Sequence, residues 1–118
     1  MRTIIAGSRT IKKFSLVEHA IIDSGFDISE VVSGEARGVD TIGEAWAAKN
    51  AIPIKCFPAD WQRFGKAAGP KRNEAMAAYA DALIAVWDGK SRGTASMITL
   101  AKNYKLRIYQ AISAPYDG

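Results

Sequence analysis

The chain has 118 residues, of which 48% are hydrophobic and 24% are charged, a balance that suits one folded domain and excludes extensive disorder. The single Cys56 excludes an internal disulfide, and with the single His19 it cannot complete a zinc site of the usual ligand sets. No apolar run spans a bilayer and the first residues do not read as a secretion signal, so we expect a cytoplasmic protein. The net charge of +4 favours an anionic partner.

Strand-like and helix-like segments alternate along the chain. Residues 2–6 read as a short apolar strand. The helix that follows has a regular apolar stripe, and we expect it to begin at a capping box of Ser15 and Glu18 and to end near Gly25. A second strand is predicted over 30–33.

The second half of the chain continues this alternation. Asp40 is a plausible N-cap of the next helix, and the strand predicted at 53–57 begins with proline, as edge strands often do. A long loop, PADWQRFGKAAG, leads to Pro70, which suits the first position of a helix. Residues 82–87 are continuously apolar, which is typical of a central strand covered on both faces. The last helix is expected to begin near Thr94, and the tail QAISAPYDG carries no clear signal.

This order of elements predicts an α/β fold. Strict alternation implies a parallel sheet with helices on both faces. We expect strands 2–6 and 82–87 at the centre and strands 53–57 and 106–109 at the edges. With right-handed crossovers, the simplest order is 3-2-1-4-5. The prediction is a single domain over 1–118, a Rossmann-like three-layer sandwich with a five-stranded parallel sheet.

Four loops rich in glycine or arginine follow the carboxyl ends of the predicted strands. They contain GSR (7–9), SGEARGVD (33–40), AGPKRN (68–73) and WDGKSRGT (87–94). In an open parallel sheet, ligands bind at this edge, where the winding direction reverses; here that point lies between the first and fourth strands. Helix N-termini and glycines let the backbone approach phosphate closely, and arginine binds phosphate through paired hydrogen bonds. The sequence therefore predicts a nucleotide or a nucleotide-derived ligand.

The candidate ligand-binding residues all come from these loops. They are Gly7, Ser8, Arg9, Ser33, Gly34, Arg37, Gly38, Asp40, Arg72, Asn73, Trp87, Asp88, Gly89, Ser91, Gly93 and Thr94. Lys71 and Arg92 add positive charge at the same edge, and Trp61 and Trp87 are candidates to stack on a base. Neither the P-loop nor the dinucleotide-binding glycine pattern is present.

Several of these residues also have a purely structural interpretation. Arg37 can pair at the surface with Glu35 or Asp40, and Asp40 is most simply an N-cap. Trp87 fits the core as well as a stacking surface. Asp88 fits a turn as well as a ribose or Mg²⁺ contact.

The four motifs resemble the SLOG superfamily, which includes DprA and the LOG phosphoribohydrolases, and in particular its small YspA-related branch of bacteria and phages. The resemblance covers nearly the whole chain, with the motifs in the expected order. It implies a Rossmann-like domain that binds nucleotides or nucleotide-derived signals. Relatives in the superfamily often form dimers, so a homo-oligomer is an option.

At one position of the last motif, this chain differs from the LOG enzymes. Their loop after the fourth strand reads P-G-G-x-G-T-x-x-E, and Gly89 to Thr94 match its phosphate-binding part. Met97 occupies the glutamate position, and a thioether cannot polarise a nucleophile or stabilise a sugar cation, which argues against the LOG mechanism. Glu35 and Glu44, from the second loop and the helix after it, are candidates to replace that glutamate, and Asp40 and Asp88 are further carboxylates in the same loops.

Three functions follow from these observations. The first is a module that senses or sequesters a nucleotide-derived small molecule, with no required cofactor and no metal site, although a nucleotide can bring Mg²⁺ with it. The second is a LOG-like hydrolase that cleaves an N-glycosidic or phosphate bond. The third is DprA-like binding of single-stranded DNA, which the concentration of positive charge at one edge disfavours. We expect no membrane partner.

Overall fold

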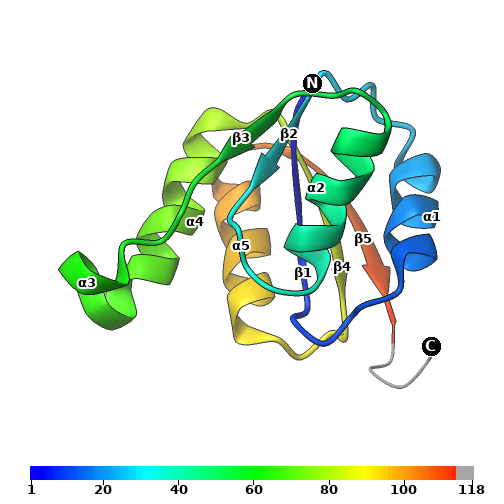
Figure 1. Ribbon diagram of the computed structural model, residues 1–118. Coiled ribbons are helices and arrows are strands. Elements are labelled where there is room, and N and C mark those ends of the chain that lie inside the picture. The colour runs from blue at the N-terminus through cyan, green and yellow to red at the C-terminus, as the bar shows by residue number, and fades with distance from the viewer. Residues whose placement is uncertain (114–118) are drawn as a thin grey trace.

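A computed structural model describes residues 1–113 and shows one five-stranded parallel sheet with the order β3-β2-β1-β4-β5 (Figure 1). The strands are β1 (Arg2–Gly7), β2 (Glu30–Ser33), β3 (Ile54–Cys56), β4 (Ala82–Trp87) and β5 (Arg107–Ile112). All four pairings are parallel. The predicted α/β fold, strand order and edge strands are therefore confirmed.

Helices cover both faces of the sheet. They are α1 (Phe14–Ser24), α2 (Val39–Lys49), α3 (Trp61–Phe64), α4 (Ala68–Tyr79) and α5 (Arg92–Asn103), with a short 3₁₀ turn, η1 (Gly65–Ala67), between α3 and α4. Figure 1 shows α1 and α2 on one face and α4 and α5 on the other, which gives the three layers of the predicted sandwich. The segment with α3 and η1 extends away from the sheet on the side of β3.

Each face of the sheet has its own hydrophobic core. Because side chains alternate along a strand, Ile4 and Leu83 face α4 and α5, whereas Ile5 and Ile84 face α1 and α2. All four of these side chains are fully buried. The apolar runs of β1 and β4 thus place these strands at the centre, and their carboxyl ends lie side by side, with Gly7 paired to Val86.

Two predicted helix starts are wrong. Helix α1 begins at Phe14, so Ser15 is already helical, and no side chain caps the N-terminus. Helix α2 begins at Val39 after Gly38, so Asp40 is its second residue and not its N-cap. The Val39 N–H donates instead to the carbonyl of Ser8, at 3.3 Å. A main-chain group from a distant loop therefore takes the place of the expected side-chain cap.

Three further boundaries differ from the prediction. The long loop after β3 contains α3, whose N-cap Asp60 accepts the N–H of Arg63, and α4 begins two residues before Pro70. Helix α5 begins at Arg92, two residues before Thr94. Strand β5 extends into the tail because its residues pair with β4 as far as Trp87. Residues 114–118 of that tail lie outside the described part of the chain.

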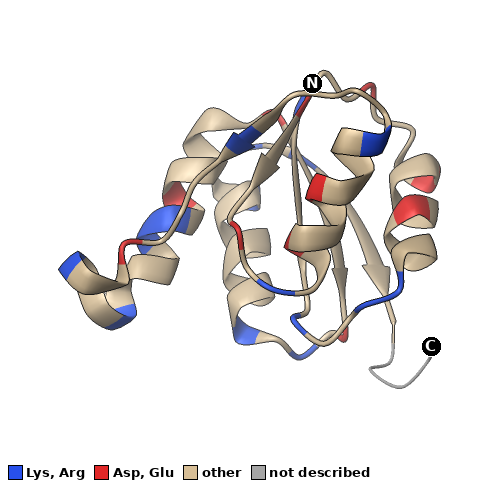
Figure 2. Ribbon diagram, in the orientation of Figure 1, with Lys and Arg blue, Asp and Glu red and all other residues tan. Residues whose placement is uncertain are grey.

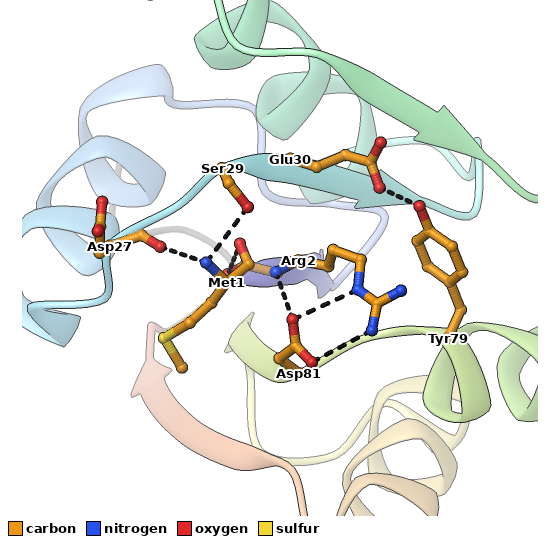
Figure 3. Close-up of polar contacts among 8 residues, drawn as sticks. Met1, Arg2, Asp27, Ser29, Glu30, Tyr79 and Asp81 are labelled. Atoms are coloured by element: carbon orange, nitrogen blue, oxygen red, sulfur yellow. Dashed lines mark hydrogen bonds and ion pairs between the residues drawn. The ribbon is translucent and has the colours of Figure 1, made fainter.

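The amino edge of the sheet is closed by its own polar contacts (Figure 3). Asp81 accepts the main-chain N–H of Arg2 at 2.8 Å and pairs with its guanidinium at 3.4 Å. These bonds from Arg2 lower the pKa of Asp81. The Tyr79 hydroxyl donates to Glu30, and the terminal ammonium donates to the carbonyl of Asp27 at 2.6 Å. Arg2 and Asp81 thus form an ion pair at this edge, and Glu30 and the terminal ammonium are bonded to neutral groups.

Candidate nucleotide-binding site

A cleft of about 360 Å³ lies at the carboxyl edge, where β1 and β4 end. We call it the carboxyl-edge cleft. The predicted site residues that line it are Gly7, Ser8, Arg9, Asp40, Arg72, Asn73, Asp88, Ser91, Gly93 and Thr94. They come from all four of the loops singled out in the sequence, so the fold brings the four motifs to one place.

A second hollow of about 490 Å³, the outer groove, adjoins the cleft on the side of β3 and α3. Arg9, Ala36 and Arg72 line both hollows, and together they form the boundary between them. The remaining residues of the groove are Gly34, Glu35, Arg37, Pro58, Ala59 and Trp61. Gly34 and Arg37, which the sequence placed among the ligand-binding candidates, therefore line the groove and not the cleft.

Some candidates line neither hollow. Ser33 is buried, and its hydroxyl donates to Glu44 at 2.6 Å; Glu44 also lines neither hollow. Gly38 forms the start of α2, and Gly89 lies in the turn after β4. Trp87 packs against the core formed with α4 and α5, and its indole nitrogen is buried without a hydrogen-bond partner among residues 1–113. This orientation favours the core interpretation of Trp87 over a stacking surface.

Two basic residues also lie outside the hollows. The ammonium group of Lys71 lies over the ring of Phe64, 4.9 Å from its centroid. Arg92 is exposed at the start of α5. The cationic groups that face the two spaces are therefore Arg9, Arg37 and Arg72.

The turn after β1 joins three loops. Gly7 is required there because a Cβ would overlap the carbonyl oxygen of Val86 and lie 2.9 Å from the side chain of Val39. The next residue, Ser8, is buried, and its hydroxyl accepts the N–H of Asp88 at 3.0 Å while its carbonyl accepts the N–H of Val39. Ser8 is thus a structural link across the floor of the cleft.

Arg72 and Asn73 connect α4 to the opposite wall. The Arg72 guanidinium donates to the carbonyl of Gly34, and its Nε donates to the side-chain oxygen of Asn73 at 3.0 Å. The Asn73 amide group reaches the carbonyl of Gly93 on α5 at 3.5 Å. These contacts hold the guanidinium group of Arg72 in one position at the edge of the cleft.

The loop after β4 is ordered by Asp88. Its carboxylate accepts the N–H groups of Lys90 at 2.8 Å and Ser91 at 2.9 Å, and these bonds lower its pKa. The loop leads into the N-terminus of α5, where the Thr94 hydroxyl donates to that of Ser91 at 3.2 Å. A Cβ on Gly93 would meet no heavy atom within 4 Å, so the first turn of α5 is open to the cleft. The first N–H groups of a helix lack partners within it and attract anions.

Asp40 is the buried acid of the cleft. Its exposure is only 5%, and its carboxylate accepts one long hydrogen bond, 3.4 Å, from the N–H of Ala36. Burial raises its pKa to about 6, although that bond and the positive charge of Arg72 act in the opposite direction. The pKa of this carboxyl group is therefore well above that of an exposed aspartate.

Sequence reasoning missed several residues that shape these spaces. Thr10, Ala36 and Met76 line the cleft, and Pro58 and Ala59 line the groove. Apart from the threonine they have no polar side chain, so no chemical signal distinguished them, although Ala36 lies inside the second motif. Met97 is 1% exposed and lines the cleft at the position where the LOG enzymes carry glutamate.

Figure 2 shows positive segments along the carboxyl edge and around α3. Within residues 1–113, no group of three or more histidine, cysteine, aspartate or glutamate side chains comes together in a way that could hold a metal ion. None of the helices described in the structure is both long and apolar enough to cross a membrane.

Comparisons with known proteins identify a family and a fold. Residues 1–64 match the model of the YspA, cpYpsA-related SLOG family. The Gene 61 protein of Mycobacterium phage D29 is 38% identical, over 79% of this chain and 82% of the phage protein.

The solved structure of DNA processing protein A (DprA) from Streptococcus pneumoniae is similar to 98% of this chain, with a TM-score of 0.78 and 19% identity. This chain spans 52% of that protein. At this level of identity, the similarity establishes the shared fold.

Proposed function

Because this chain belongs to the YspA, cpYpsA-related SLOG family, we propose that it binds a nucleotide or nucleotide-derived ligand in the carboxyl-edge cleft, as a sensor or sequestering module. Family membership and the DprA-like fold support a function related to nucleotides or DNA in general. The proposal goes further and assigns the ligand to the cleft.

The observation that carries the proposal is that Arg9, Arg72 and the open first turn of α5 all line one cleft. In this assignment the ligand phosphate lies against the N–H groups of the turn at Gly93 and is neutralised by the two guanidinium groups. Asp40 accepts a ligand hydroxyl, such as one from ribose. No cofactor is required, and any Mg²⁺ would arrive with the nucleotide.

The geometry favours binding over LOG-like hydrolysis. The LOG-like mechanism needs a carboxylate at the motif position after β4, and that position holds the apolar side chain of Met97. Of the two candidate glutamates, Glu44 is bonded to Ser33, and Glu35 lies in the outer groove. The assignment to one domain and to the cytoplasm stays a prediction, as does assembly into a homo-oligomer.

The proposal is tested with a panel of nucleotides, including cyclic and ADP-ribose-type molecules. Thermal shift and isothermal titration calorimetry report binding, and chromatography of the same mixtures reports turnover. A stabilising shift without new products supports the binding module, whereas release of free base or phosphate supports the hydrolase.

Arg9→Ala is the diagnostic variant, because Arg9 is exposed and lines both hollows. Its removal is expected to lower the affinity for a phosphorylated ligand about tenfold or more, the effect of one charge-assisted hydrogen bond. Lys12→Ala is the matched control, since Lys12 is an exposed cation of the same loop that lines neither hollow. Equal losses in both variants would indicate general charge attraction and would contradict the assignment to the cleft.

A further inference from the structure

The outer groove combines an exposed aromatic ring with cationic side chains. Trp61 is 53% exposed although it is a large apolar side chain, and it lines the groove together with Arg9, Arg37 and Arg72. Glu35 is the one acidic residue among the residues that line it. Exposed aromatic rings beside arginines bind nucleobases by stacking and the neighbouring phosphates by charge.

The groove is continuous with the cleft. Arg9, Ala36 and Arg72 line both spaces, so a ligand that leaves the cleft past these residues enters the groove directly. The cleft, at about 360 Å³, is near the lower limit of ligand pockets and suits one nucleotide unit. The groove adds a space of about 490 Å³ with the same charge preference.

We propose that the outer groove is a second nucleoside subsite, so that the ligand has two nucleoside units joined through phosphate. This inference rests on the proposed function, because the first unit occupies the carboxyl-edge cleft. The base of the second unit stacks on Trp61. Arg37 neutralises the phosphate of that unit, and Arg9 and Arg72 contact the phosphate that links the two units.

Calorimetry with two matched sets of probes tests the subsite. One set consists of AMP, GMP, CMP and UMP, and the other of the four corresponding 5′-phosphorylated homodinucleotides. We expect the best dinucleotide to bind about tenfold or more tightly than its mononucleotide, as one stacked base contributes on this scale. Trp61→Ala is expected to abolish this advantage and to leave the affinity for the mononucleotide within about twofold, whereas Trp61→Phe retains most of it because stacking needs only an aromatic face.

Two further variants test whether the effect on dinucleotide binding is limited to residues that line the groove. Arg37→Ala is expected to weaken the dinucleotide alone, since Arg37 lines only the groove. Arg63→Ala is the control, because Arg63 lies on the same short helix as Trp61, over the ring of Phe64, and lines neither hollow.

The outcomes distinguish the two proposals. A dinucleotide that binds no more tightly than its mononucleotide, or a Trp61→Ala variant that loses both ligands equally, overturns the second subsite and leaves the cleft assignment intact. Failure of every probe to bind, together with failure of the wider nucleotide panel, overturns both. Because Trp61 is 53% exposed, its substitution removes less buried surface than the loss of a core aromatic residue would, and thermal unfolding of the variant checks that the fold is kept.

Discussion

The guanidinium of Arg72, on α4, donates a hydrogen bond to the main-chain carbonyl of Gly34, in the loop after β2. The two residues are 38 positions apart in the sequence, and their contact lies where the cleft and the groove meet. A Cβ at position 34 would lie 2.8 Å from Nη1 of Arg72. The glycine is therefore needed for the arginine to hold its position.

Gly34→Ala tests this relationship. The added methyl group displaces the end of the Arg72 side chain, which is flexible, so the free energy of unfolding should fall by only about 0.5–1.5 kcal/mol, the contribution of one hydrogen bond. Nucleotide affinity should fall about tenfold, because a charge-assisted contact is lost. Urea unfolding and calorimetry measure the two effects. An affinity equal to that of the wild type would show that Arg72 does not contact the ligand.

Gly93→Ala is expected to separate binding from stability. The new methyl group meets no atom within 4 Å, so the fold has room for it, and replacing glycine by alanine in a helix stabilises by up to about 1 kcal/mol. The methyl group protrudes where a phosphate would approach the N-terminus of α5, so nucleotide affinity should fall about tenfold. Calorimetry and thermal unfolding check both effects. Ser96→Ala, on the same helix outside the cleft, should leave binding unchanged.

Asp40 predicts a particular dependence of stability on pH. The folded protein holds the Asp40 proton up to pH about 6, whereas the unfolded chain releases it near the ordinary pKa of 3.8. The stability that this group contributes is therefore present below pH 3.8 and is lost as the pH rises to about 6, by roughly 2–3 kcal/mol.

The Asp40→Asn variant has no carboxyl group at position 40, so its free energy of unfolding should not show this decrease with rising pH. The difference in the free energy of unfolding between wild type and variant, measured in urea from pH 3.5 to pH 7, should move in favour of the variant as the pH rises. The other carboxylates titrate in both proteins, so their contribution to the pH dependence cancels in this difference. Asp23→Asn, at an exposed position of α1, is the control. A difference that stays flat across the range would mean that Asp40 titrates normally.

Ser8→Ala should destabilise the link under the cleft. Without the hydroxyl, the N–H of Asp88 loses its partner in a largely buried place, at a cost of about 1–3 kcal/mol in the free energy of unfolding. Ser15→Ala is the comparison, because the Ser15 hydroxyl makes no hydrogen bond in the described residues and caps no helix. Its removal should be neutral or slightly stabilising in the same urea experiment. A large loss in Ser15→Ala would restore the capping role that the sequence suggested.

The sequence predicted more of the sheet than of the helix starts. The continuous apolar run at 82–87 predicts a strand covered on both faces, and this is a local pattern that the burial of β4 follows. The residues of β3 are all exposed, so only its place at the edge, and not a buried face, was predicted correctly. The predicted start of α1 was late, since Ser15 is already helical, and no side chain in the described part of the chain caps that helix. The predicted start of α2 failed because aspartate is a useful cap only when no other group satisfies the helix end. At α2 the carbonyl of Ser8, distant in the sequence, already does so.

By itself, the sequence determined the order of the elements, the central and edge strands, and the chemistry of the loops that meet at one edge of the sheet. These properties follow from periodicity and from the parallel connections, which local residues dictate. Only the tertiary structure decided that Asp40 is buried, that Trp87 faces the core, and that Arg9 and Arg72 lie between two hollows. Burial and contact between distant loops depend on how whole helices pack against the sheet, and no short stretch of residues encodes that packing alone.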